Sequence, residues 1–347
     1  MLTRRLASSA TVVATSFAAR WSIATSSSEQ NPNGLPDPEW YAQQNAHILL
    51  HLSLVEEARQ RWWHEVTRRL RDKNAGEDVD EQCAKTGESL LHVAALAGRR
   101  KLVEELLEMH GAAGTLRDRR GRTPLLCCAE HGSEVVAETL VTKGHADVNE
   151  CDSSGANAMA IAARLGHVRL VRWLLTRKEL REPLQRDVYG THALHKAVSF
   201  GQIACVEALL ADTRVKAKID LPVGSIDHSV PSSYDAKSGG ETALHLACGH
   251  TYWFHHKCHT RIAKLLVNAG ADPNLRTGAE ARTAVHCAAA AGNVGVLRML
   301  LSSGRVADAT WTARDGKGST AQDLANGNRE VLAVLAEART GRRASPT

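Results

Sequence analysis

The sequence predicts an all-α protein, a helical solenoid in which short hairpin-like turns join repeated pairs of helices. Similar seven-residue segments recur along most of the chain, a glycine follows most of them at a fixed distance, and paired aliphatic residues come next. Composition agrees, because 43% of the residues are hydrophobic but only 4% are aromatic. The core must therefore consist mainly of Ala, Leu and Val, which suits thin, closely packed helices.

The repeated segments share a Thr-like first residue, apolar positions and a pair of small residues. They are SLLHVAA from Ser89, TPLLCCA from Thr123, NAMAIAA from Asn157, HALHKAV from His192, TALHLAC from Thr242, TAVHCAA from Thr283 and, more weakly, TAQDLAN from Thr320. The intervals between these starts are 34, 34, 35, 50, 41 and 37 residues. The first three intervals set the period, and the two longest indicate insertions.

A glycine lies nine residues after the start of five segments, between two helical patterns. A helix end at this point needs a residue that tolerates positive φ. The five glycines are Gly98, Gly132, Gly166, Gly201 and Gly292. Paired apolar residues follow and predict a second helix that faces the next layer: Leu106 and Leu107, Leu140 and Val141, Leu174 and Leu175, Leu209 and Leu210, and Leu300 and Leu301.

With these residues the chain resembles the ankyrin-repeat family, whose signature combines Thr-Pro-Leu-His, an Ala pair, Gly, a Leu pair and Gly-Ala-Asp-x-Asn. The last element is matched best by residues 145–149 and 270–274, and the resemblance covers about residues 86–338. It implies that the Thr hydroxyl and the His ring hold the turn of each repeat by hydrogen bonds. It also implies that the chain binds another protein.

We expect the repeats to occupy residues 81–338, with degenerate units capping both ends because a terminal unit needs one solvated face. Residues 29–80 are expected to form a linker and the N-terminal helical cap, with arginines between Arg59 and Arg71 on that face. A strip that contacts RNA is the alternative for these arginines. A short helix from Arg329 to Ala338 closes the stack, and residues 339–347 form a tail.

Residues 1–28 contain Arg4, Arg5 and Arg20, many Ser, Thr and Ala, and no acidic residue. This composition predicts a mitochondrial presequence, with a chloroplast peptide, a secretory signal or an untargeted tail of a cytoplasmic protein as alternatives. Without its three arginines the 43 basic residues become 40 against 38 acidic ones, a net charge of +2. Net charge therefore gives little reason to expect nucleic acid as a partner.

No apolar run approaches the roughly 18 residues that a membrane span needs, so we expect no membrane insertion. The eight cysteines are scattered without framework spacing, which predicts free thiols in a reducing compartment. The sequence has no nucleophile elbow, HExxH motif, dinucleotide glycine pattern or phosphate loop. We therefore expect a protein that is not an enzyme and that works by binding.

The two long intervals carry the insertions. Residues 211–239, rich in Ser, Asp, Pro and Gly, join one repeat to the next and predict either a surface loop without a role or an extended recognition finger. Residues 249–259 lie between the two helices of one repeat and are rich in histidine and aromatic residues. We expect them to form a contact loop or a metal site.

The metal hypothesis depends on helical spacing. If the second helix begins near His255, then His255, Cys258 and His259 share one face, and Cys248 or His250 could approach from the first helix. Such a set would bind zinc. Its spacing matches no familiar zinc pattern, and Cys248 takes the small-residue position of other repeats, so the default expectation is no cofactor.

In the ankyrin family, partners bind the concave side, which is made of the hairpin tips and the exposed positions of the first helices. Carried over to this sequence, these positions are Arg119, Arg120, Arg122, Glu130, His131, Arg164, Leu165, Val188, Tyr189, Ser199 and Phe200. A basic end would thus grade into an apolar patch, with Leu165, Tyr189 and Phe200 as anchors. The alternative is that these are ordinary exposed residues.

Overall fold

The computed structural model describes residues 55, 58, 63–71, 78–224, 240–249, 256–278 and 280–340. It divides into two compact units, Met1–Glu77 and Asp78–Thr347. In the described part of the first unit, helix α5 (Trp63–Arg71) buries Val66 and Leu70, where the sequence predicts the N-terminal cap. The presequence at 1–28, the centre of the 211–239 insertion and residues 250–255 lie outside the described residues.

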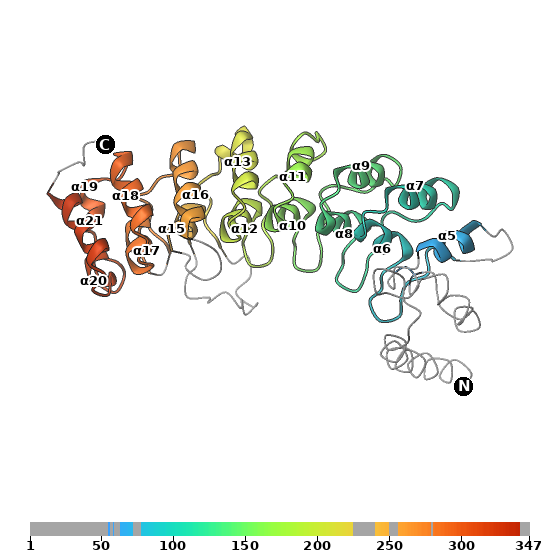
Figure 1. Ribbon diagram of the computed structural model, residues 1–347, viewed down its shortest axis with the longest axis horizontal. Helices are drawn as coiled ribbons and strands as arrows, with labels where there is room; N and C mark the ends of the chain where they lie inside the picture. Colours follow the sequence, from blue (N-terminus) through green and yellow to red (C-terminus); the bar gives the residue numbers. More distant parts are fainter. Residues whose placement is uncertain are drawn as a thin grey trace, which may run out of the picture. The chain divides into compact units, whose positions relative to one another are not determined.

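The second unit consists of two rows of helices (Figure 1). The first row holds α6 (Leu90–Leu96), α8 (Pro124–His131), α10 (Ala158–Leu165), α12 (Ala193–Ser199), α15 (Ala243–Gly249), α17 (Ala284–Ala290) and α20 (Ala321–Leu324). The second row holds α7 (Arg100–Met109), α9 (Glu134–Thr142), α11 (Val168–Leu175), α13 (Ile203–Ala211), α16 (His256–Ala269), α18 (Val294–Ser303) and α21 (Arg329–Arg339). Each helix contacts its neighbours in the row and its partner in the same repeat.

The described residues contain helices and isolated bridges but no strand, so the all-α solenoid is confirmed. Two further short helices, α14 (Thr213–Lys216) and α19 (Asp308–Trp311), follow α13 and α18. No helix in the described part of the chain has the length and apolarity needed to cross a membrane.

The predicted glycines end the first helices as expected. Gly132 and Gly166 have φ of 85° and 83° and cap α8 and α10, and Gly98, Gly201 and Gly292 also have positive φ. At the other end of α10, the Asn157 side chain accepts a hydrogen bond from the Ala160 amide at 2.9 Å. The N-cap oxygen and the amide of the left-handed residue bond to backbone groups that the ends of a helix leave unpaired.

The core lies between the rows. The first residue of each predicted aliphatic pair is fully buried there: Leu106, Leu140, Leu174, Leu209 and Leu300. Small residues of the first helices, such as Ala94 and Ala95 in α6, are also fully buried and let neighbouring helices approach closely. The core therefore consists mainly of Ala, Leu and Val, as the composition predicts.

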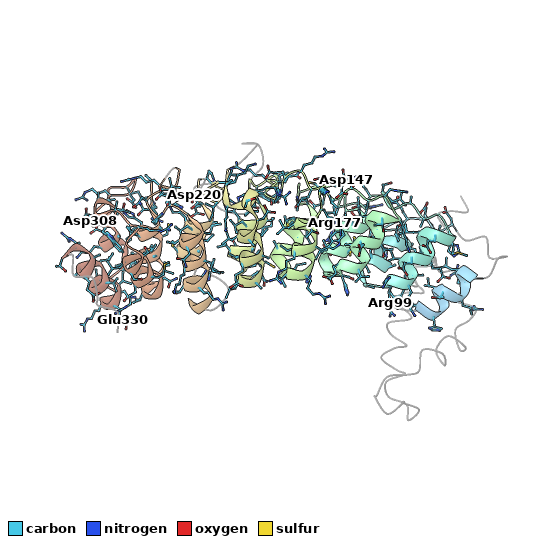
Figure 2. All side chains as sticks on the ribbon, turned by 90° about the horizontal axis from the view of Figure 1, so that it is seen from above. Arg99, Asp147, Arg177, Asp220, Asp308 and Glu330 are labelled. Carbon is cyan, nitrogen blue, oxygen red and sulfur yellow. The ribbon has the colours of Figure 1, made fainter. Side chains whose placement is uncertain are left out.

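Two kinds of connection run along opposite edges of the rows. Figure 2 shows Asp147 and Asp308 on one edge, after second helices, and Arg99 and Glu330 on the other, near the tight turns inside repeats. At the first edge the Asn149 side chain donates to the Asp147 carboxylate at 2.8 Å and to the carbonyl of Glu179 in the next repeat at 2.9 Å. This explains the Asp-x-Asn motif, because it fixes the spacing of adjacent repeats.

Candidate functional site

Aspartates fix the shape of the hairpin tips. The Asp118 carboxylate accepts hydrogen bonds from the amides of Arg120 and Arg122, both at 2.8 Å. Gly121 closes the same turn by donating to the Asp118 carbonyl at 2.9 Å. Asp152, Asp187 and Asp315 accept the equivalent amide pairs in their own turns. Side chains at the tips therefore project from a rigid backbone.

Adjacent tips are joined to one another. The Ser153 amide donates to the Arg120 carbonyl at 2.9 Å, and the Val188 amide donates to the Ser154 carbonyl at 2.9 Å. The Arg119 amide makes the corresponding bond to Thr86 at 3.0 Å. The tips of four repeats thus form one continuous edge, which holds the predicted tip residues in a fixed order.

Buried histidines hold the turns to the next repeat. In α17, His286 Nδ1 lies 2.8 Å from the Thr283 hydroxyl, and His286 Nε2 lies 3.0 Å from the Ala313 carbonyl. His92 and His245 make the equivalent contacts. Burial lowers the pKa of all three rings. The role that the resemblance implied for the Thr hydroxyl and the His ring is therefore confirmed.

The structure corrects the assignment of Arg122. Its side chain is only 8% exposed, and its guanidinium lies 2.7 Å from Asp118, 3.0 Å from Glu88 and 3.0 Å from Glu130. Glu88 belongs to the preceding repeat, so Arg122 joins two repeats. The prediction that Arg122 contacts a partner is wrong, because its donors face three carboxylates inside the protein.

Other basic residues of the predicted surface face solvent. Arg119, Arg120 and His131 are exposed, and Arg164 is partly exposed at the end of α10. Within the described residues, no ion pair involves Arg119, Arg120 or Arg164. Glu130, by contrast, is half-buried and paired with Arg122.

Three large apolar side chains remain exposed in the region where the sequence predicts anchors. Leu165 is 39% exposed, Tyr189 36% and Phe200 41%. Leu165 and Phe200 occupy equivalent positions at the ends of the contacting helices α10 and α12. The Arg164 guanidinium carbon lies 6.0 Å from the centre of the Phe200 ring. We call Leu165, Tyr189 and Phe200 the apolar patch.

Ser199 and Val188 complete the predicted set, and both are half-buried. We use the name inner surface for the described tips and first-helix ends of α8, α10 and α12, with Arg119, Arg120, Arg164 and the apolar patch as its exposed side chains.

A family model described as ankyrin repeats (3 copies) matches residues 58–150 and 137–221, and one described as ankyrin repeats (many copies) matches residues 251–301. The chain belongs to the ankyrin-repeat family. Ankyrin repeats form protein-protein interaction domains, so protein is the class of partner that this fold implies.

Relatives and solved structures agree with the assignment. Mouse Inversin is 29% identical over 248 residues, which are 65% of this chain and 23% of Inversin, so the chain spans about a quarter of that relative. The ankyrin repeat domain of human ASB11 is 25% identical, with a TM-score of 0.57. The match covers 75% of this chain and 100% of the ASB11 domain. The ankyrin repeat domain of Bcl-3 is 24% identical, with a TM-score of 0.57, and the match covers 73% of this chain and 100% of that domain. At this identity the match supports the fold only.

Sequence reasoning missed Leu96. This residue is 36% exposed at the end of α6, in the first of the described ankyrin repeats. It lies seven residues after Ser89, the same offset that separates Arg164 from Asn157 and Ser199 from His192. The signal was therefore present in the register of the repeats.

The described residues test only part of the zinc hypothesis. Cys248 is fully buried in α15, where burial raises the pKa of its thiol, and His259 is buried in α16. His250 and His255 lie outside the described residues, as does the side chain of Cys258. Among the residues that the structure describes, no three His, Cys, Asp or Glu side chains gather as metal ligands. Zinc binding stays a prediction, which elemental analysis of the purified chain tests.

Proposed function

We propose that this chain is a non-catalytic adaptor or assembly factor that binds another protein on its inner surface. The apolar patch carries the proposal, because Leu165, Tyr189 and Phe200 are large and exposed, and the Arg164 guanidinium lies over the Phe200 ring. Aromatic anchors at the centre of an interface supply much of its binding energy. Their exposure in the free chain leaves that apolar area available to a partner.

The rigid backbone beneath the patch supports the same conclusion. Tyr189 lies in a turn fixed by the Asp187 carboxylate, which accepts from the Tyr189 amide at 3.0 Å and from the Thr191 amide at 2.8 Å. A surface that is already ordered loses little conformational entropy when it binds. The tip therefore needs no refolding to receive a ligand.

The lack of catalysis is part of the proposal. Burial raises the pKa of the Cys127 and Cys128 thiols to about 12, which makes them poor nucleophiles at neutral pH. The three buried histidines that bond to carbonyls of the next repeat serve the fold. These two cysteines and three histidines therefore have structural roles.

Affinity capture with surface variants tests the adaptor role. The tagged chain is incubated with mitochondrial matrix extract, beside Tyr189→Ala plus Phe200→Ala and a control that changes exposed apolar residues of second helices, Val135→Ala plus Met109→Ala. We expect a stoichiometric protein on the wild type and the control that is lost from the first variant. Equal capture by all three would reject this surface.

We also propose that the protein works in the mitochondrion, on the basis of the composition of residues 1–28. A fluorescent protein fused behind residues 1–40 should enter mitochondria. The same fusion with Arg4, Arg5 and Arg20 changed to Glu should stay outside, because import depends on the positive charge of the segment. Mitochondrial entry of both fusions, or of neither, would contradict this location.

A further inference from the structure

The exposed arginines of the inner surface have no internal counter-charge. Arg119 and Arg120 lie on a tip and Arg164 at the end of α10, and within the described residues none of the three forms an ion pair. The Arg119 guanidinium donates a hydrogen bond to the Ala84 carbonyl, which leaves its charge without a counter-ion. Some basic residues in or at the end of second helices do have such pairs: Lys143 lies 2.7 Å from Glu108, and Arg261 lies 2.8 Å from Glu207. The positive charge of the inner surface is thus available to a ligand.

Carboxylates near these arginines are already engaged. Asp118 and Glu130 both face Arg122, and Asp187 lies 2.7 Å from the Lys196 ammonium. Asp152 accepts hydrogen bonds from the amides of its own turn. These carboxylates are buried or half-buried and already bonded, so the charged groups that the inner surface presents to solvent are mainly the arginines.

Positive charge and apolar area occur side by side. The Arg164 guanidinium lies over the Phe200 ring, and Leu165 follows Arg164 in the same helix. A ligand that satisfies both must present an apolar side chain with a carboxylate close to it. Arginine suits such a ligand, since its planar donors match a carboxylate with two hydrogen bonds.

We propose that the inner surface binds an acidic segment of a partner protein, with an aromatic or leucine side chain on the apolar patch and flanking carboxylates on Arg119, Arg120 and Arg164. The inference rests on the proposed function and adds the chemistry of the partner. Complementary charge would raise the association rate and orient the segment along the tips.

Two other occupants fit less well. Residues 1–28 of the chain itself carry three arginines and no carboxylate, so they have no side-chain anion to offer the exposed arginines. RNA-binding surfaces typically contact several phosphates and stack bases on aromatic rings. Three unpaired arginines offer few phosphate contacts, and Leu165 has no flat face for a base.

Selection from a peptide library displayed on phage tests the proposal. The full chain is the bait, and enriched peptides are synthesised with a fluorophore and measured by anisotropy. We expect enriched sequences with an aromatic residue or leucine beside Asp or Glu, and binding that weakens as salt rises. Arg120→Glu plus Arg164→Glu should weaken binding by about tenfold or more. Arg172→Glu, an exposed charge reversal in the second helix α11, should leave it unchanged.

Circular dichroism first shows that each variant is folded. The binding results then distinguish the binding surface from the acidic chemistry of the partner. Neutral or basic peptides that still require Phe200 would overturn the acidic partner and leave the adaptor surface standing. Peptides that bind equally well to Phe200→Ala would contradict both. Failure to enrich any sequence, or tight salt-sensitive binding of a labelled oligouridine that is lost with Arg120→Glu plus Arg164→Glu, would also overturn the acidic-segment proposal.

Discussion

The rings of His192 and His195 stack inside the fourth repeat, with centroids 3.7 Å apart and planes inclined by 22°. His192 occupies the repeat position that Thr242 and Thr283 occupy in later repeats. Those threonines hold the ring nitrogen of the following histidine at 2.9 and 2.8 Å. Within the described residues, His192 Nε2 and both ring nitrogens of His195 are buried without a hydrogen-bond partner. The fourth repeat therefore lacks a bond that the fifth and sixth repeats have.

Replacing His192 by threonine should stabilise the protein. The hydroxyl would reach His195 Nδ1 as Thr283 reaches His286, and a hydrogen bond to a buried group contributes about 1 kcal/mol. Urea unfolding should show an increase of about that size in the free energy of unfolding. Thr283→His, the reverse change in a later repeat, should lower it. A less stable His192→Thr would contradict the assignment.

Stability should fall as the solution is acidified. Burial lowers the pKa of His192 to about 4 and that of His195 well below its ordinary value, whereas an unfolded histidine titrates near about 6.5. Between these values the unfolded chain binds more protons than the folded one, so the free energy of unfolding decreases as the pH falls from about 6.5 towards 4. Urea unfolding at pH 7 and pH 5 measures the change. His192→Thr should reduce it, and equal stability at the two pH values would contradict the prediction.

Removing the Arg122 side chain should destabilise the first repeats. Arg122→Ala leaves Asp118, Glu88 and Glu130 without their shared cation, and breaking a buried ion pair costs about 3–5 kcal/mol. Arg120→Ala, in the same turn but exposed, should change the free energy of unfolding by less than about 0.5 kcal/mol. Chemical denaturation measures the free energy of unfolding of the two variants and of the wild type. Similar values for both would show that Arg122 is not a structural residue.

Glycine at the end of α8 should be hard to replace. Gly132 has φ of 85°, and an added Cβ would lie 2.3 Å from His167 Nδ1. The His167 ring would have to move, although its Nε2 lies 2.9 Å from the Glu130 carbonyl. We expect Gly132→Ala to cost about 2–3 kcal/mol from backbone strain and the lost bond. Gly111→Ala, at φ of 65° with open space around it, should cost only the strain, about 1 kcal/mol. Equal losses would contradict the steric account.

The sequence predicted the fold almost completely, because each repeat carries its own start, glycine and aliphatic pair. It predicted the exposure of Leu165, Tyr189 and Phe200 from their register alone. It failed for Arg122, whose burial depends on Glu88 in the preceding repeat. Both residues directly precede a repeated segment, so aligning the repeats could have found the pair. The missing bond at His195 needed coordinates, since it depends on how two rings stack.

Photo-crosslinking in cells tests the central claim, that a protein binds the apolar patch. Phe200→p-benzoylphenylalanine places a reactive group in the patch, and Met109→p-benzoylphenylalanine places one at an exposed position of α7, a second helix. After irradiation we expect a discrete adduct at position 200 that survives ribonuclease, is removed by protease and is absent at position 109. No adduct at position 200, or the same adduct at both positions, would contradict the claim.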